Sequence, residues 1–104
     1  MENGYDIYWT SHALIELAAT YAYLETHFNP SILHQLSRDL DRVLRLIAKN
    51  PSTFALSDFK GVRRTVVRKF NTLYYREVGH RIEIISFFSN RQNSEVLLQQ
   101  LKKK

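Results

Sequence analysis

The 104-residue chain has no cysteine, which excludes disulfide bonds, thiolate metal sites and thiol nucleophiles. It has only three glycines and shows neither a glycine-rich phosphate loop nor a low-complexity segment. No apolar run approaches the roughly 18 residues of a membrane span, and no secretory signal peptide is visible. The four histidines are scattered along the chain and form no metal-ligand motif, so we expect no metal and no cofactor. A cytoplasmic protein without membrane contact, folded as one domain over residues 1–104, is expected.

What the chain does have is an uneven distribution of charge. Residues 1–59 hold four Lys or Arg and seven Asp or Glu, whereas residues 60–104 hold eleven and three. A positive half indicates a polyanionic partner, or an acidic protein partner, on one surface. A solvated basic face that ends in a lysine tail explains the same numbers. The charge alone therefore leaves both interpretations open.

The first half of the chain predicts one strand and two helices. Residues 5–9 alternate as a strand, and Thr10 can cap a helix over residues 11–28 whose apolar side chains recur at spacings of three and four. Asn29–Pro30 ends that helix and begins a second one, which Asn50–Pro51 ends. The short connection predicts an antiparallel helical hairpin.

After Gly61 the apolar period changes to two, which is typical of strands. Three strands are expected over residues 62–68, 73–78 and 81–88, joined by turns at Phe70–Asn71 and Gly79–His80. A short helix is expected from Ser94 to Leu101. The predicted fold class is α+β, with a helical hairpin packed on one face of an antiparallel sheet, in the order β-α-α-β-β-β with a short C-terminal helix.

Five cationic side chains of the basic half are candidates for binding a target. Guanidinium groups suit phosphates and carboxylates, because their forked donors match two oxygens at once. The cations then form a groove on the free face and the strand ends of the sheet. Alternatively, they lie along the strands and pair with Glu77 and Glu83. The candidates are Arg64, Arg68, Lys69, Arg76 and Arg91.

Arg91 stands among three amide side chains, where the last strand ends in SFFSNRQNSE. It either contacts a partner or holds the strand end by pairing with Glu95 or a carbonyl oxygen, and both interpretations stay open. Of the aromatic side chains, Tyr74 or Tyr75 is a candidate for the surface, because one of that pair faces away from the helices.

The order of elements resembles the RelE/ParE superfamily of type II toxin–antitoxin toxins. The likeness rests on GVRRTVVRKFNTLYYREVGHRIEIISFFSNRQNSE at residues 61–95, on WTSHALIELAATYAYLETHF at residues 9–28 and on NPSTF at residues 50–54. It covers nearly the whole chain. The resemblance implies a toxin of the plasmid-stabilisation type whose partner is a cognate antitoxin, in a toxin–antitoxin hetero-oligomer.

The superfamily contains two activities. RelE-like members cleave mRNA on the ribosome, and ParE-like members poison DNA gyrase. Metal-free RNA cleavage needs proton-transfer groups and cations. In this chain the mid-strand arginine of the cleaving members falls near Thr72 and their C-terminal tyrosine falls on Leu97, while Arg91 matches the family's C-terminal arginine. The resemblance therefore favours a ParE-like gyrase inhibitor that binds and is not an enzyme.

Two alternatives remain beside this expectation. The first is a RelE-like, metal-independent mRNA endoribonuclease acting on the ribosome, with an unconventional site made of Arg68, Lys69, Tyr75 and Arg91. The second is a non-toxic protein that binds nucleic acid.

Overall fold

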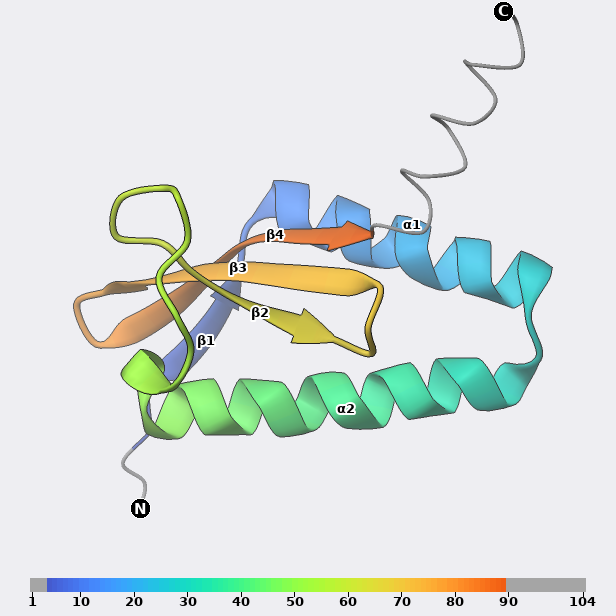
Figure 1. Ribbon diagram of the computed structural model, residues 1–104, viewed down its shortest axis with the longest axis horizontal. Coiled ribbons are helices and arrows are strands. Elements are labelled where there is room, and N and C mark those ends of the chain that lie inside the picture. Colours follow the sequence, from blue (N-terminus) through green and yellow to red (C-terminus); the bar gives the residue numbers. More distant parts are fainter. Residues whose placement is uncertain (1–3, 90–104) are drawn as a thin grey trace, which may run out of the picture.

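The computed structural model describes residues 4–89, in which two helices pack against a sheet of four strands (Figure 1). The elements are β1 (Asp6–Trp9), α1 (Ser11–His27), α2 (Pro30–Lys49), the short 3-10 helix η1 (Pro51–Thr53), β2 (Arg63–Val67), β3 (Asn71–Val78) and β4 (Arg81–Ser89). The predicted α+β class and order of elements are confirmed. The expected helix from Ser94 to Leu101 lies outside the described residues. Within residues 4–89, no helix is long and apolar enough to cross a membrane.

The strands lie in the order β1-β4-β3-β2. β2, β3 and β4 form the predicted antiparallel meander, whereas β1 joins β4 in parallel, with Ile7 beside Ile82 and Trp9 beside Ile84. The sheet is therefore mixed. Parallel pairing of β1 is possible because α1, α2 and the meander supply the long connection that parallel strands need.

The two helices begin at the residues that the sequence indicated. The hydroxyl of Thr10 accepts a hydrogen bond from the amide of Ala13 at 3.1 Å, which caps α1. The side-chain oxygen of Asn29 accepts from the amide of Ser31 at 3.2 Å, and Pro30 occupies the first turn of α2. These caps fix the hairpin whose inner surface covers one face of the sheet (Figure 1).

The core lies between that face and the helices. Each strand of the meander contributes alternate side chains to it, and α2 contributes one per turn, as amphipathic periodicity requires. The largest fully buried apolar side chains are Tyr75, Phe87, Leu36, Ile47, Leu73, Ile82, Ile84 and Val67.

Beyond Ile84, none of the described strands lies on the β1 side of β4, and α1 protects this edge instead. The Oε1 atom of Glu16 accepts hydrogen bonds from the amide of Phe87 at 2.9 Å and from the hydroxyl of Ser86 at 2.6 Å. The hydroxyl of Thr10 donates to the carbonyl of Ile85 at 3.2 Å. The carboxylate of Glu16 is thus turned inward, because a partly buried backbone amide requires an acceptor.

Candidate functional site

The β2–β3 turn carries two of the candidate cations, Arg68 and Lys69. We expected Arg68 within a strand and the turn at Phe70–Asn71, and this placement is wrong. β2 ends at Val67, residues 68–70 form the turn, and Asn71 is the first residue of β3. The side-chain amide of the buried Asn71 donates to the carbonyl of Val67 at 3.0 Å, which closes the turn earlier than the apolar pattern indicated.

Both turn cations have a left-handed backbone, with φ of 56° at Arg68 and 70° at Lys69. In this region a side chain crowds the backbone, at a cost of roughly 1–2 kcal/mol for each non-glycine residue. Two adjacent residues of this kind persist only where the surrounding contacts determine the conformation. The backbone of the turn is therefore held in one conformation.

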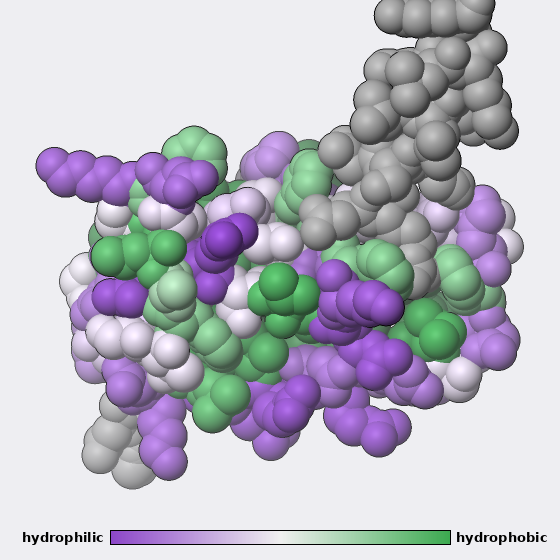
Figure 2. All heavy atoms as spheres, in the orientation of Figure 1, coloured by the Kyte–Doolittle hydropathy of each residue, from purple (hydrophilic) through white to green (hydrophobic). Residues whose placement is uncertain are grey.

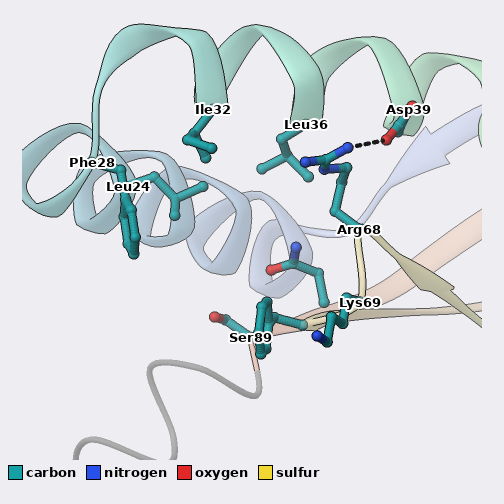
Figure 3. A pocket seen from close by; sticks show the side chains of 10 residues that line it. Leu24, Phe28, Ile32, Leu36, Asp39, Arg68, Lys69 and Ser89 are labelled. Atoms are coloured by element: carbon teal, nitrogen blue, oxygen red, sulfur yellow. Dashed lines mark hydrogen bonds and ion pairs between the residues drawn. The ribbon is translucent and has the colours of Figure 1, made fainter.

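Contacts with α2 hold Arg68 in place. One guanidinium nitrogen lies 3.3 Å from the carboxylate of Asp39 (Figure 3). The other donates to the side-chain oxygen of Gln35 at 2.5 Å. Asp39 also receives a contact from Arg42 at 3.4 Å. Arg68 is thus a link between the turn and the helix as well as a surface charge.

Lys69 is held differently. Its ammonium group lies 5.5 Å from the centre of the Phe70 ring, which is a cation–π distance. No carboxylate among residues 4–89 forms an ion pair with it. The exposed charge of Lys69 is therefore available to a partner.

Between the turn and the helices lies a cavity of about 320 Å³. Apolar side chains of α1, α2 and the connection between them form one wall, and the turn and the end of β4 form the other (Figure 3). The lining residues are Leu24, Phe28, Ile32, Leu36, Asp39, Arg68, Lys69, Phe70, Asn71 and Ser89. The cavity joins an apolar interior to a cationic rim, an arrangement that suits an apolar group next to an anionic one.

Arg64 and Arg76 lie apart from the turn, on the face of the sheet that the helices leave uncovered. Arg76 binds Glu83 on β4 through two nitrogens, each 2.8 Å from the same carboxylate oxygen. Arg64 is exposed opposite Tyr74. The ring of Tyr74 meets Phe59 edge-on, with centroids 6.4 Å apart.

These side chains form a mixed surface, and the space-filling view shows apolar groups between polar ones on the side of the molecule turned to the viewer (Figure 2). The exposed apolar side chains of the β2 strand and of the loop before it are large. They belong to Leu56, Phe59 and Val66.

Tyr75, a member of the alternative nuclease set, is fully buried. Its hydroxyl donates to the carbonyl of Pro51 at 2.8 Å. Burial raises the pKa of Tyr75 above its ordinary value of 10.0, and the backbone hydrogen bond near Phe54 and the charge of Arg63 offset part of that increase. The structure therefore brings Arg68 and Lys69 together but leaves Tyr75 in the core.

The remaining sequence candidates have different positions. Thr72, where the cleaving members have a cation, is buried between its neighbours Val66 and Phe88. Arg91 and Leu97 lie outside the described residues. Asp39 and Gln35, which hold Arg68, were not predicted, because no local motif links positions so far apart in the chain.

No family model and no curated protein matches the chain. Solved structures do match. A chain of the chromosomal ParDE TA system from P. aeruginosa has a TM-score of 0.70 and 19% identity, covering 85% of this chain and 98% of that one. One from the E. coli DinJ-YafQ toxin-antitoxin complex has a TM-score of 0.58 and 12% identity, covering 86% and 96%. The YoeB/ParE toxin from Agrobacterium tumefaciens has a TM-score of 0.56 and 14% identity, covering 81% and 96%.

The protein has the fold of these toxin–antitoxin chains. The RelE/ParE-like fold that the sequence resemblance implied is thereby confirmed. The fold places a turn with two cations on the side of the helical hairpin that carries the α1–α2 connection, and a second cationic region on the uncovered face of the sheet. A shared fold does not by itself determine an activity, which depends on the side chains of these two regions.

Proposed function

We propose that the protein is the toxin of a type II toxin–antitoxin pair and that it is ParE-like, inhibiting DNA gyrase by binding. The similarity of its fold to the ParDE chain supports the toxin class. The observation that carries the proposal is the β2–β3 turn, where Lys69 stands without a carboxylate partner among the described residues at the rim of an apolar cavity. This is the geometry of a contact surface.

The groups around the turn support binding over RNA cleavage. Cleavage without a metal requires a group that takes the proton of the attacking 2′-hydroxyl beside the cations. Tyr75 is buried, and its raised pKa keeps the proton on its hydroxyl at neutral pH. The carboxylate of Asp39 is occupied by Arg68 and Arg42. The described residues thus offer cations for an anionic partner and no proton acceptor beside them.

The fixed backbone of the turn favours tight binding. A side chain that is already held in position loses less conformational entropy when a partner binds. Arg68 is fixed by α2, and its neighbour Lys69 shares the left-handed turn. The partner surface that fits this region has an acidic group next to an apolar one.

We further propose that a cognate antitoxin binds the protein in the cytoplasm and forms a hetero-oligomer with it. The structures of related fold include the DinJ-YafQ toxin-antitoxin complex, which supports a partner of this kind. A segment with an apolar side chain beside a carboxylate matches the cavity and Lys69. Binding there would cover the cation that the target needs.

Two parallel assays test the proposal. The purified chain is added to DNA gyrase with relaxed plasmid and ATP, and separately to a translating extract with a defined mRNA. We expect supercoiling to be inhibited and the mRNA to remain intact. Codon-positioned cuts in the mRNA with unaffected supercoiling would contradict the proposal and favour the ribosome-dependent endoribonuclease. Activity in neither assay would contradict both toxin functions.

A further inference from the structure

The outward face of α1 has no role in the proposed function. Leu14 is 49% exposed and Ile15 is 69% exposed, although both are large aliphatic side chains. Ala18 and Ala22 are also exposed. At 100° per residue, these four positions fall within an arc of about 100° on the helix, so they form one continuous stripe. We call this stripe the α1 face.

The four positions of the α1 face are uncharged, and the only charged residue between Ser11 and Ala22 is turned away from it. That residue is Glu16, whose carboxylate binds Phe87 and Ser86 at the edge of β4. The nearest charge on the same arc is the exposed Glu25, beyond Ala22. The exposed side of α2 differs sharply, since it carries two ion pairs within the helix, Arg42 with Asp39 and Arg45 with Asp41. An uncharged aliphatic stripe of this kind marks a contact surface.

We propose that the α1 face binds a second copy of this chain, with two α1 helices packed antiparallel about a twofold axis at Ala18. In this arrangement Leu14 of one copy lies opposite Ala22 of the other, at both ends of the contact. A large side chain therefore meets a small one twice, and the alanine on the axis lets the helices approach closely. The stripe is complementary to itself, as a twofold interface requires.

Charge also favours this orientation. The first turn of α1 contains no acidic residue, so the partial positive charge of its N-terminus has no neighbouring side-chain anion in that turn. The antiparallel pairing brings Glu25 of one copy opposite Ser11 of the other, at that N-terminus. A parallel pairing would instead put Leu14 against Leu14 and bring like helix ends together. The sequence of α1 thus selects the antiparallel pair.

The contact is small. From Ser11 to Glu25 the helix rises about 21 Å at roughly 1.5 Å per residue. A single helix pair of this length buries less than the roughly 1,200 Å² typical of stable complexes. The dimer is therefore weak, and it forms at high local concentration rather than at trace levels.

Cysteine cross-linking tests the register directly, because the natural chain has no cysteine. Leu14→Cys and Ala22→Cys chains are mixed and oxidised, and each is oxidised alone. The mixture should give several times more disulfide dimer than either variant oxidised alone. In the proposed pair, two copies of the same position are offset by about 12 Å along the helix axis. A disulfide spans a Cα separation of only roughly 4.4–6.8 Å, so identical positions cannot be joined. The matched control is Arg38→Cys with Leu46→Cys, an exposed pair with the same spacing on α2. That mixture should give no more disulfide dimer than either α2 variant oxidised alone.

Sedimentation of the full chain over a range of concentrations provides the second measurement. The wild-type mass should rise towards that of a dimer, and Ala18→Glu should remain monomeric because it places two carboxylates together on the axis. Unchanged circular dichroism and melting temperature would show that Ala18→Glu still folds. A wild-type monomer at every concentration, without excess cross-linking in the Leu14→Cys and Ala22→Cys mixture, would overturn the proposal. So would protection of the α1 face only when an antitoxin is bound, which would assign the face to a foreign helix.

Discussion

The two cationic regions differ in how the protein holds their charges. On the uncovered face of the sheet, Arg76 is paired with Glu83, and the backbone is an ordinary strand. At the β2–β3 turn, Arg68 is tied to α2 across the molecule, and Lys69 projects from a left-handed backbone beside a cavity. In the first region Arg76 is neutralised locally and Arg64 is exposed on a strand, whereas the second region keeps the charge of Lys69 exposed at a strained position.

This difference indicates where a partner binds most tightly. Exposed ion pairs contribute little to stability and leave little net charge for a target. A cation that is fixed beside apolar surface gives a partner both a charge and an area to bury. We therefore expect the turn to dominate target recognition and the sheet face to contribute less.

The largest effect is expected from reversing the free charge of the turn. Lys69→Glu should raise the concentration needed to inhibit gyrase by about 100-fold, because it sets like charges against each other at the contact. Lys60→Glu changes the net charge equally but lies on the loop before β2, so its effect should stay below about threefold by the same reasoning. An equal loss of gyrase inhibition in the two variants would show that only the overall charge of the protein matters. The β2–β3 turn would then not differ from the rest of the basic surface.

Tyr75→Phe separates a structural role from a catalytic one. The carbonyl of Pro51 would lose its donor in the core, so the free energy of unfolding in urea should fall by about 1–2 kcal/mol. Gyrase inhibition by the folded variant should not change. Loss of activity at unchanged stability would instead place Tyr75 in the chemistry of the turn.

The stability difference between wild type and Tyr75→Phe should also depend on pH. Because the pKa of Tyr75 is raised in the folded protein, its contribution to stability is complete below pH 10.0 and is lost as the pH rises through the folded pKa. The stability difference between wild type and Tyr75→Phe should therefore shrink above about pH 10. A constant difference up to the highest pH at which both proteins fold would contradict the burial of this hydroxyl.

Lys69→Gly should uncouple stability from function. Glycine tolerates the left-handed backbone, so the free energy of unfolding should rise by about 0.5–1 kcal/mol while gyrase inhibition falls. Arg64→Gly, within β2, should lower the free energy of unfolding by a similar amount, because glycine weakens a strand. If both glycine variants lost stability equally, the turn would not have the conformation described here.

The smallest effect is expected on the sheet face. A double-mutant cycle on Arg76 and Glu83 should give a coupling of about 0.5 kcal/mol, because the Arg76 side chain is 52% exposed and solvent screens the pair. Single variants at either position should leave gyrase inhibition within about threefold, as expected of rim charges. A strong loss of inhibition in Arg76→Ala would make the sheet face the main contact and reverse the comparison.

The sequence predicted the elements well because their signals are local. The caps at Thr10 and Asn29 and the changes of apolar period locate the helices and strands. The β2–β3 turn escaped prediction because its left-handed residues are an arginine and a lysine, where such a turn usually shows glycine or asparagine. The link from Arg68 to Asp39 escaped because it joins residues of different elements, whose proximity only the packed fold determines.

The most direct test of the account is whether the protein traps the covalent intermediate between gyrase and DNA. Gyrase and plasmid are incubated with increasing amounts of the wild-type, Lys69→Glu or Lys60→Glu chain, and the linear DNA released by denaturation is measured. We expect cleaved DNA to accumulate with wild type and Lys60→Glu and to be nearly absent with Lys69→Glu. No cleaved DNA with the wild-type chain, at concentrations that arrest growth or translation, would contradict the proposal that the turn binds gyrase.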